Sequence, residues 1–238
     1  MNRSSAFYFQ QFAIEQDQCA MKIGLDSVLL GAWVPIVNPK RILDIGTGTG
    51  ILSLMMAQRS KAIIDAVEID ERAFQQAKCN IKESKFHKQI VCFNTSIQDF
   101  DSTSSYDVII SNPPYFEKSL KSGDKARDTA RHNDQLSLDD LFSRASQLLA
   151  PQGILAFILP YSSLEQINTR AKKYAFFISH ITEVKGRKHK NPNRILICLQ
   201  KEETKANIKS LTVYDEEGKY TADFQALTKD FYLPSTFR

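Results

Sequence analysis

Short apolar runs and amphipathic segments alternate along most of this chain, and that alternation constrains the fold more than any other feature. The apolar runs have the length of buried strands, and the amphipathic segments carry apolar residues at helical spacing. The expected strands cover residues 41–46, 62–70, 88–94, 106–111 and 153–160, and the expected helices cover residues 51–58, 71–84, 137–150 and 163–174. Strands that alternate with helices form parallel sheets with right-handed crossovers. We therefore expect an α/β fold with a doubly wound, mostly parallel sheet.

Two further apolar runs, 176–186 and 193–201, follow each other without a helix between them. We expect them to pair as an antiparallel hairpin at the edge of the sheet, which brings the sheet to seven strands. The 238 residues are enough for a single domain of this kind. Within it we expect an N-terminal segment (1–40), a core (41–201) and an appendage of one strand, a turn and a short helix (202–238) packed on the core.

The cysteines and the charge balance exclude several classes of protein. Cys19, Cys79, Cys92 and Cys198 are scattered singly, which predicts neither a zinc site nor a disulfide framework and suits a reducing cytoplasm. The sequence shows no apolar signal segment and no run long enough to cross a membrane. We expect a cytoplasmic monomer that binds neither a metal nor a membrane. The net charge of +4 is too small to indicate binding of nucleic acid by itself. Whether the basic residues form clusters is the more informative observation.

A glycine-rich turn follows the first expected strand. In "LDIGTGTG" (43–50), Asp44 closes the strand and Gly46, Gly48 and Gly50 lie two residues apart before a helix. Glycines at such a place let a ligand approach main-chain amides at a helix N-terminus. The spacing differs from the G-x-G-x-x-G pattern of dinucleotide sites, and no Lys-Ser/Thr pair follows, so a dehydrogenase is disfavoured. Asp44 would repel a pyrophosphate but could pair with an ammonium group.

Glu68 lies at the end of the second strand. A carboxylate in this place can accept hydrogen bonds from both hydroxyls of a ribose, and ligands of open α/β sheets bind at the carboxyl ends of the strands. A ligand with a cationic amine near Asp44 and a ribose near Glu68 is indicated. S-adenosylmethionine has both groups.

The fourth strand ends in Asn112-Pro113-Pro114-Tyr115. Two prolines end the strand and leave a stiff, extended stub. Hydrogen bonds from an exocyclic amine to the Asn112 side-chain oxygen and the Pro113 carbonyl would favour a tetrahedral nitrogen and stabilise the charge that develops on it during methyl transfer. Tyr115 could stack on a flipped-out base.

These motifs resemble the class I S-adenosylmethionine-dependent methyltransferases that act on planar amines, whose fold is Rossmann-like. Three longer stretches make the resemblance more specific. The stretch "FYFQQFAIEQDQCAMKIGLDSVLLGAW" (7–33), the stretch "VKGRKHKNPNRILI" (184–197) and the tail from residue 212 to 233 are similar to the bacterial tRNA(Val) adenine-N(6) methyltransferases, which modify the adenine next to the anticodon. "ARHNDQLSLDDL" (130–141) fits the same group. The resemblance covers nearly the whole chain.

The resemblance implies a set of cofactor contacts. Lys22, Gly24 and Asp26 would cover the methionine end of the cofactor, and Asp44 with the three glycines would line its amino-acid moiety. Glu68 would bind the ribose. The superfamily often uses an acidic residue after the third strand for the adenine amine. Ser96 stands there in this chain, so the contact falls to Ser96 and Ile97, or to Asp99.

Two basic clusters flank these motifs and predict contact with RNA. The first follows the stub and contains Lys118, Lys121, Lys125, Arg127, Arg131 and His132. The second, in the expected hairpin, contains Lys185, Arg187, Lys188, His189, Lys190 and Arg194, and both clusters flank the aromatic residues Tyr115 and Phe116, which are also expected to contact RNA. Clusters of this kind bind phosphates and make binding sensitive to salt. Neither His132 nor His189 has a partner at metal-ligand spacing.

Four functions remain open at this point. The first is methylation of adenine in a tRNA anticodon loop. The second is methylation of a glutamine amide, as in the release-factor methyltransferases, which usually carry a separate N-terminal helical domain. DNA adenine methylation would normally need an added target-recognition domain. A non-catalytic RNA-binding module would be expected to have lost the glycine turn or Asn112, and the sequence retains both.

Overall fold

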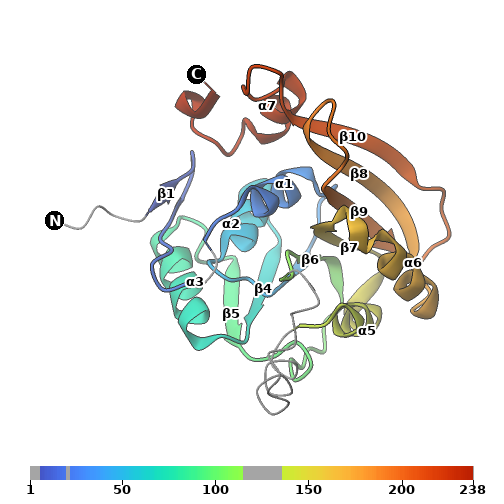
Figure 1. Ribbon diagram of the computed structural model, residues 1–238. Helices are drawn as coiled ribbons and strands as arrows, with labels where there is room; N and C mark the ends of the chain where they lie inside the picture. The colour runs from blue at the N-terminus through green and yellow to red at the C-terminus, as the bar shows by residue number, and fades with distance from the viewer. Residues whose placement is uncertain (1–5, 20–21, 115–135, 238) are drawn as a thin grey trace, which may run out of the picture.

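The structure, a computed structural model, describes residues 6–19, 22–114 and 136–237. One central sheet with helices on both faces dominates these residues (Figure 1). A separate antiparallel pair, β1 (Phe7–Tyr8) and β2 (Ala13–Ile14), lies beside it. The expected α/β fold with a mostly parallel sheet is therefore confirmed.

The central sheet has eight strands in the order β10-β8-β9-β7-β6-β3-β4-β5 within the described residues. The strands are β3 (Arg41–Ile45), β4 (Ile63–Glu68), β5 (Ile90–Asn94), β6 (Tyr106–Ser111), β7 (Leu149–Pro160), β8 (Phe177–Arg187), β9 (Arg194–Gln200) and β10 (Asn207–Tyr214). Only β9 runs against its neighbours, and it pairs antiparallel with both β7 and β8.

The sheet differs from the expected seven strands at one edge. The strand expected in the C-terminal appendage is β10, and it joins the sheet parallel to β8. The hairpin β8–β9 is antiparallel as expected, but it lies inside the sheet because β10 covers β8 on the outer side. β7 also begins earlier than expected, at Leu149, directly after the preceding helix ends.

The described helices are α1 (Leu25–Trp33), α2 (Ile51–Arg59), α3 (Glu71–Glu83), α5 (Leu138–Leu148), α6 (Leu164–Lys173) and α7 (Ala222–Thr228). Side chains of α1, α2, α3 and α7 belong to one buried cluster, and side chains of α5 and α6 belong to another. The strands alternate between the clusters: in β7, Leu155 and Phe157 enter the second cluster, while Ala156 and Ile158 enter the first. The protein thus has three layers, with the sheet in the middle. No described helix is long and apolar enough to cross a membrane.

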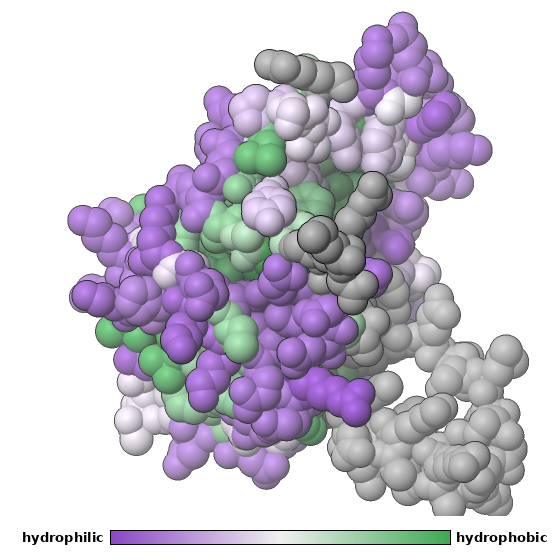
Figure 2. Space-filling view, turned by 90° about the vertical axis from the view of Figure 1, so that its left-hand side faces the viewer, coloured by the Kyte–Doolittle hydropathy of each residue, from purple (hydrophilic) through white to green (hydrophobic). Residues whose placement is uncertain are grey.

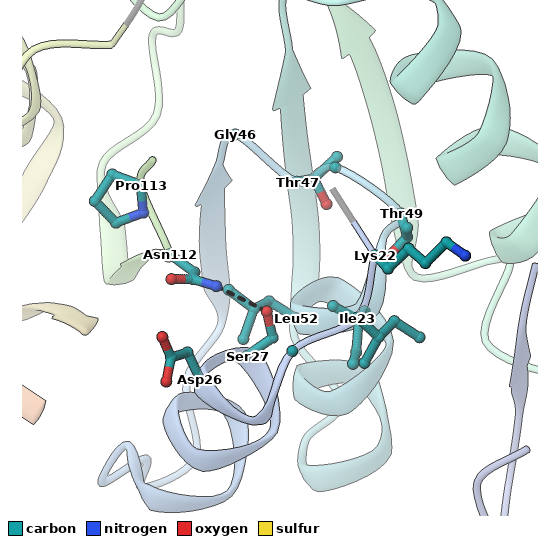
Figure 3. A pocket seen from close by; sticks show the side chains of 13 residues that line it. Lys22, Ile23, Asp26, Ser27, Gly46, Thr47, Thr49, Leu52, Asn112 and Pro113 are labelled. Atoms are coloured by element: carbon teal, nitrogen blue, oxygen red, sulfur yellow. Dashed lines mark hydrogen bonds between the residues drawn. The ribbon is translucent and has the colours of Figure 1, made fainter. Parts of the chain in front are cut away.

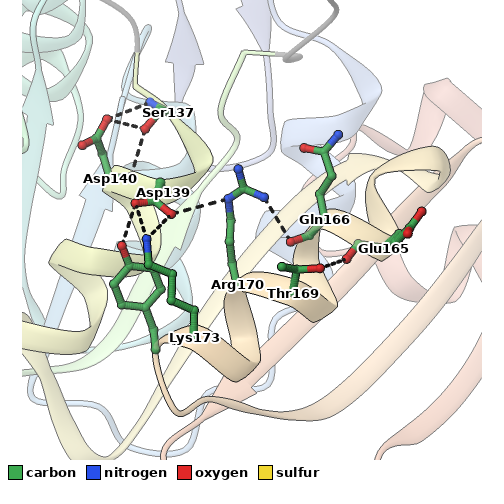
Figure 4. Close-up of polar contacts among 9 residues, drawn as sticks. Ser137, Asp139, Asp140, Glu165, Gln166, Thr169, Arg170 and Lys173 are labelled. Carbon is green, nitrogen blue, oxygen red and sulfur yellow. Dashed lines mark hydrogen bonds and ion pairs between the residues drawn. The ribbon is translucent and has the colours of Figure 1, made fainter.

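Polar contacts hold α5 and α6 to each other at the surface (Figure 4). Ser137 caps α5 in a reciprocal capping box with Asp140, which satisfies free amides at the helix start. Asp139 accepts hydrogen bonds from Lys173 at 3.0 Å and from the Tyr174 hydroxyl at 2.7 Å. The hydroxyl and the ammonium lower the pKa of Asp139, and because this carboxylate is exposed, the gain in stability is small.

The segment around β1 and β2 packs against the C-terminal part of the chain. The Gln10 side chain donates to the carbonyls of Lys229 at 2.5 Å and Tyr232 at 2.7 Å, and its backbone amide donates to Phe231. The rings of Phe9 and Tyr232 stack with centroids 6.0 Å apart. Figure 2 views the molecule from the β1 side, where a largely hydrophilic surface surrounds a smaller hydrophobic area.

Candidate functional site

The carboxyl ends of three adjacent strands bring the predicted motifs together. β3 lies between β4 and β6, and Ile45 near its end pairs with Val67 of β4 and Ser111 of β6. The next residues along the three strands are therefore Gly46, Glu68 and Asn112. The sheet register alone places the glycine turn, the carboxylate and the stub at one edge.

The glycine turn leaves open space at its surface. Gly46, Gly48 and Gly50 have φ values of 70°, 57° and 85°, which side chains rarely tolerate. A Cβ built at Gly46 or Gly48 would meet nothing within 4 Å, whereas one at Gly50 would touch Ala77 of α3 at 3.5 Å. Gly50 therefore serves the packing of α2 on α3, while the other two border a cradle that a ligand could fill.

Asp44 lies beneath this turn and is fully buried. Its Oδ2 accepts hydrogen bonds from the Thr47 hydroxyl at 2.6 Å and from the Ser53 hydroxyl at 2.7 Å, and also from the Ser53 amide at 3.1 Å. Its Oδ1 finds no hydrogen-bond partner among the described residues. Burial is the main cause that raises the pKa of Asp44 to about 6. Asp44 lines neither of the two pockets beside the turn, so its contact with a cationic amine stays a prediction.

Glu68 is held by backbone amides at the wall of a second pocket. Its Oε2 accepts from Gly48 at 2.8 Å and its Oε1 from Asp70 at 3.0 Å, and each oxygen keeps a lone pair for a hydroxyl donor. The second pocket is lined by Glu68 together with Ile45, Gly46, Val67, Ile69, Thr95, Ser96, Ile97, Gln98 and Leu136. Its walls are largely aliphatic, which suits a planar ring.

The structure separates the alternatives for the residue after the third strand. Ser96 and Ile97 line the second pocket, and Asp99 is not one of the described residues that line it. Ser96 instead holds Asp99, because its hydroxyl donates to the Asp99 carboxylate at 2.7 Å and accepts from the Asp99 amide at 3.0 Å.

The first pocket lies between the glycine turn and the segment that leads into α1 (Figure 3). Its lining includes Lys22, Gly24 and Asp26, which the sequence assigned to a covering segment. Lys22 is exposed, and its ammonium points away from Asn112 in Figure 3. The remaining lining residues are Ile23, Ser27, Gly46, Thr47, Gly48, Thr49, Ile51, Leu52, Asn112 and Pro113.

Asn112 is held in one orientation at the wall of this pocket. Its Nδ2 donates to the hydroxyl of Ser27 at 2.9 Å, and its Oδ1 points away from Ser27, toward the side where Pro113 and Asp26 lie (Figure 3). The amide oxygen is thus presented together with the proline stub. Tyr115, the last residue of the predicted motif, lies outside the described residues.

The basic clusters are only partly described. Tyr115, Phe116, Lys118, Lys121, Arg127, Arg131 and His132 lie outside the described residues. In the second cluster, Arg187, Lys188 and Lys190 are exposed at the turn between β8 and β9. Arg194 differs from them, because its Nε donates to Asp26 at 3.0 Å in a partly buried ion pair.

Several supporting residues were not found by reading the sequence. Besides Ser27, Thr47 and Ser53, the structure reveals Asn80, which is 4% exposed. Its side chain accepts from the Glu15 amide and donates to the carbonyls of Glu15 and Thr49, all at 2.9 Å. Asn80 therefore ties the N-terminal segment to the glycine turn. A signal for it existed, because an asparagine stands on the apolar face of the amphipathic segment 71–84.

Solved structures share the fold of this chain. The M. jannaschii tRNA m1G37 methyltransferase superposes with a TM-score of 0.62 at 15% identity, over 86% of this chain and 56% of that one. The P. horikoshii protein TYW2, solved in complex with MeSAdo, superposes with a TM-score of 0.60 at 16% identity, over 85% and 74% of the two chains. At these identities the likeness shows the shared fold.

Comparison with known sequences identifies the family more specifically than the shared fold does. The model of the methyltransferase small domain matches residues 19–169. A protein of Phocaeicola vulgatus named tRNA1(Val) (adenine(37)-N6)-methyltransferase is 43% identical over 95% of this chain and 97% of its own length. A protein of the same name from Pectobacterium carotovorum is 42% identical over 97% and 95%. The chain belongs to the methyltransferase small domain family, and within it to the group that carries this name.

Proposed function

We propose that this protein transfers the methyl group of S-adenosylmethionine to the exocyclic N6 of adenine 37, the base next to the anticodon, in tRNA1(Val). The relatives with this name match over almost their whole length, which supports the substrate. The observation in the structure that carries the proposal is the Asn112 amide. It is fixed on Ser27 at the wall of the first pocket, with its oxygen presented beside Pro113.

The pocket residues suggest how the cofactor is held. Asp44 Oδ1 would accept from the amino group, and the open faces of Gly46 and Gly48 would receive the amino-acid moiety, with Gly50 closing the turn behind them. Glu68 would bind the ribose hydroxyls, and Ser96 with Ile97 would border the adenine in the second pocket. Lys22, Gly24 and Asp26 would cover the methionine end. When bound, the cofactor supplies an electrophilic methyl group.

The chain's own groups prepare the amine that is methylated. Asn112 Oδ1 and the Pro113 carbonyl would each accept one N–H of the adenine amine. This draws the nitrogen lone pair out of conjugation and stabilises the positive charge that develops on the nitrogen. The proton can leave after transfer, so no general base is required. We assign stacking on the base to Tyr115, as the sequence predicts.

Exposed cations beside the site support an RNA substrate. Arg187, Lys188 and Lys190 are exposed at the β8–β9 turn, whereas Arg194 at the start of β9 is partly buried and pairs with Asp26. We also propose that the protein acts as a monomer, in the cytoplasm where its substrate is found. Among the described residues, no group of His, Cys, Asp and Glu side chains could hold a metal.

A glutamine amide is the alternative substrate, because it is also planar and could bind the same stub. The experiment that separates the two is transfer of labelled methyl from S-adenosylmethionine to unmodified tRNA, followed by nucleoside analysis. We expect the label in N6-methyladenosine. Label in a glutamine-bearing protein, with none in tRNA, would overturn the proposed substrate.

Asn112→Ala tests the role of the amide in the same assay. We expect kcat to fall by about 10²–10³-fold, the range for loss of a group that acts on developing charge, while the cofactor Kd changes little. Asn207→Ala, at an exposed asparagine on β10, is the matched control and should leave both quantities unchanged. An equal loss of cofactor affinity and turnover in Asn112→Ala would contradict the assigned role.

A further inference from the structure

The ion pair between Arg194 and Asp26 joins two parts of the site that the sequence assigned to different ligands. The Arg194 Nε lies 3.0 Å from the Asp26 Oδ2, across 168 positions of the sequence. The side chains are 29% and 17% exposed, so the pair is less screened than one at the open surface. Asp26 lines the first pocket, so a shift of Asp26 would change that pocket.

Arg194 is anchored on the sheet. It is the first residue of β9, where its backbone pairs with Pro160 of β7 and with Val184 of β8. Its Nη1 also donates to the carbonyl of Asn193 at 2.9 Å, which limits the directions that the guanidinium can take. The guanidinium is therefore a fixed point against which another segment can be held.

Asp26 lies in the first turn of α1, directly before the buried residues 27–30. The cap of that helix is Gly24, which has no side chain to make a capping hydrogen bond. Gly24 and Asp26 line the first pocket. They also line a separate cavity, different from the second pocket, which Val184, Arg194 and Tyr214 border. The turn thus borders two cavities, and the ion pair with Arg194 is one of the contacts that hold it.

The turn from Gly24 to Ser27 bears directly on the reacting groups. Ser27, the residue after Asp26, receives the hydrogen bond that orients the Asn112 amide. An ion pair that fixes Asp26 therefore also fixes the acceptor that holds Asn112. Misplacement of such a group by about 1 Å can cost about 10²-fold in rate.

We infer that Arg194 is a positioning residue for methyl transfer: through Asp26 it holds the first turn of α1 as a wall of the cofactor pocket and as the support of Asn112. Arg187, Lys188 and Lys190 on the same hairpin are exposed and have the RNA-facing role. The inference rests on the proposed function for its turnover readout, but cofactor affinity tests it without RNA.

The test compares Arg194→Gln, Asp26→Asn, the double variant and Lys190→Gln, the last as the control for a lost RNA contact. Calorimetry without RNA should show that Arg194→Gln weakens cofactor binding by about tenfold, with a similar or larger fall in kcat. In the Asp26→Asn background, the same change should add little, because the pair is already broken. Arg194→Lys, which keeps the charge, should recover part of the loss.

The salt dependence of tRNA binding separates the two roles. Lys190→Gln should lower the log–log slope by roughly 0.7, as expected for one lost phosphate contact on a single strand, and Arg194→Gln should leave it unchanged. The inference is overturned if Arg194→Gln lowers the slope like Lys190→Gln, if it leaves cofactor affinity intact, or if it has its full effect in the Asp26→Asn background. A wild-type protein that binds cofactor but methylates no tRNA would contradict the proposed function. The role of Arg194 would then be decided by the calorimetric measurement of cofactor affinity alone.

Discussion

Burial of the ionised Asp44 carboxylate lowers the free energy of unfolding, and replacing Asp44 should show by how much. Its pKa of about 6 in the folded protein lies above the ordinary value of 3.8. The difference of about 2 corresponds to about 3 kcal/mol, at 1.36 kcal/mol for each pKa unit. Because the folded pKa is the higher one, the contribution of Asp44 to stability is most favourable below pH 4 and is lost as the pH rises through 6. The penalty is then constant at higher pH.

Asp44→Asn removes the charge and keeps an oxygen that can accept from Thr47 and Ser53. Since a neutral amide does not titrate, the stability of the variant relative to wild type should rise with pH. Urea unfolding at pH 4.5 and pH 8 should show a rise of about 2 kcal/mol, because part of the penalty is already present at pH 4.5. Asp223→Asn, at an exposed aspartate of α7, controls for general effects of charge and should show no comparable change.

The same variant should bind S-adenosylmethionine poorly. A hydrogen bond to a charged group contributes about 1.5–3 kcal/mol, so loss of the carboxylate beside the amino group predicts about 10–100-fold weaker binding. The protein would thus gain stability near neutral pH and lose its ligand. A stability difference that is the same at both pH values would refute the reasoning about burial, and unchanged cofactor affinity would refute the contact.

Two further variants test the supports around the pocket and the RNA surface. Asn80→Ala removes three buried hydrogen bonds between the N-terminal segment and the glycine turn, and should cost about 2–3 kcal/mol in the free energy of unfolding and raise the cofactor KM. Gln75→Ala on the exposed face of α3 is its control, and equal behaviour of the two would contradict the role of Asn80. Lys188→Ala combined with Lys190→Ala should weaken tRNA binding and lower its salt slope by about 1.4, and an unchanged slope would remove this turn from the interface.

The parts of the fold that follow from local pattern could be predicted from the sequence. β6 spans the expected residues 106–111, and α3 ends one residue before the expected boundary. The position of β9 inside the sheet also left a signal, since its five inner residues, 195–199, form a continuous apolar run of the kind that central strands have. β10 is half exposed, and its pairing with β8 depends on contacts between distant residues that no local pattern reveals.

In the candidate site, too, some residues could be placed from the sequence and others could not. Residues at the ends of strands could be placed together from the alternation alone, because parallel strands share one carboxyl edge. The residues that hold them could not, since Ser27 comes from a helix without a capping side chain and with Gly31 in its interior. A Cβ at Gly31 would lie 2.5 Å from the Met55 sulfur, so this glycine permits close packing of α1 on α2 although its sequence reads as a helix breaker. At Gly31, tertiary packing rather than local helix propensity determines that the segment is a helix.

The contacts of Gln10 with residues 229–232 determine when the pocket can be completed during synthesis. A ribosome releases the N-terminal segment first, and these partners emerge about 220 residues later. Until then the segment from Phe9 to Glu15 is held by its hydrogen bonds with Asn80 and by packing of its apolar side chains in the core. The nascent chain should therefore form its sheet before it can bind cofactor tightly, and release of residues around Tyr232 would be the step that makes the protein competent.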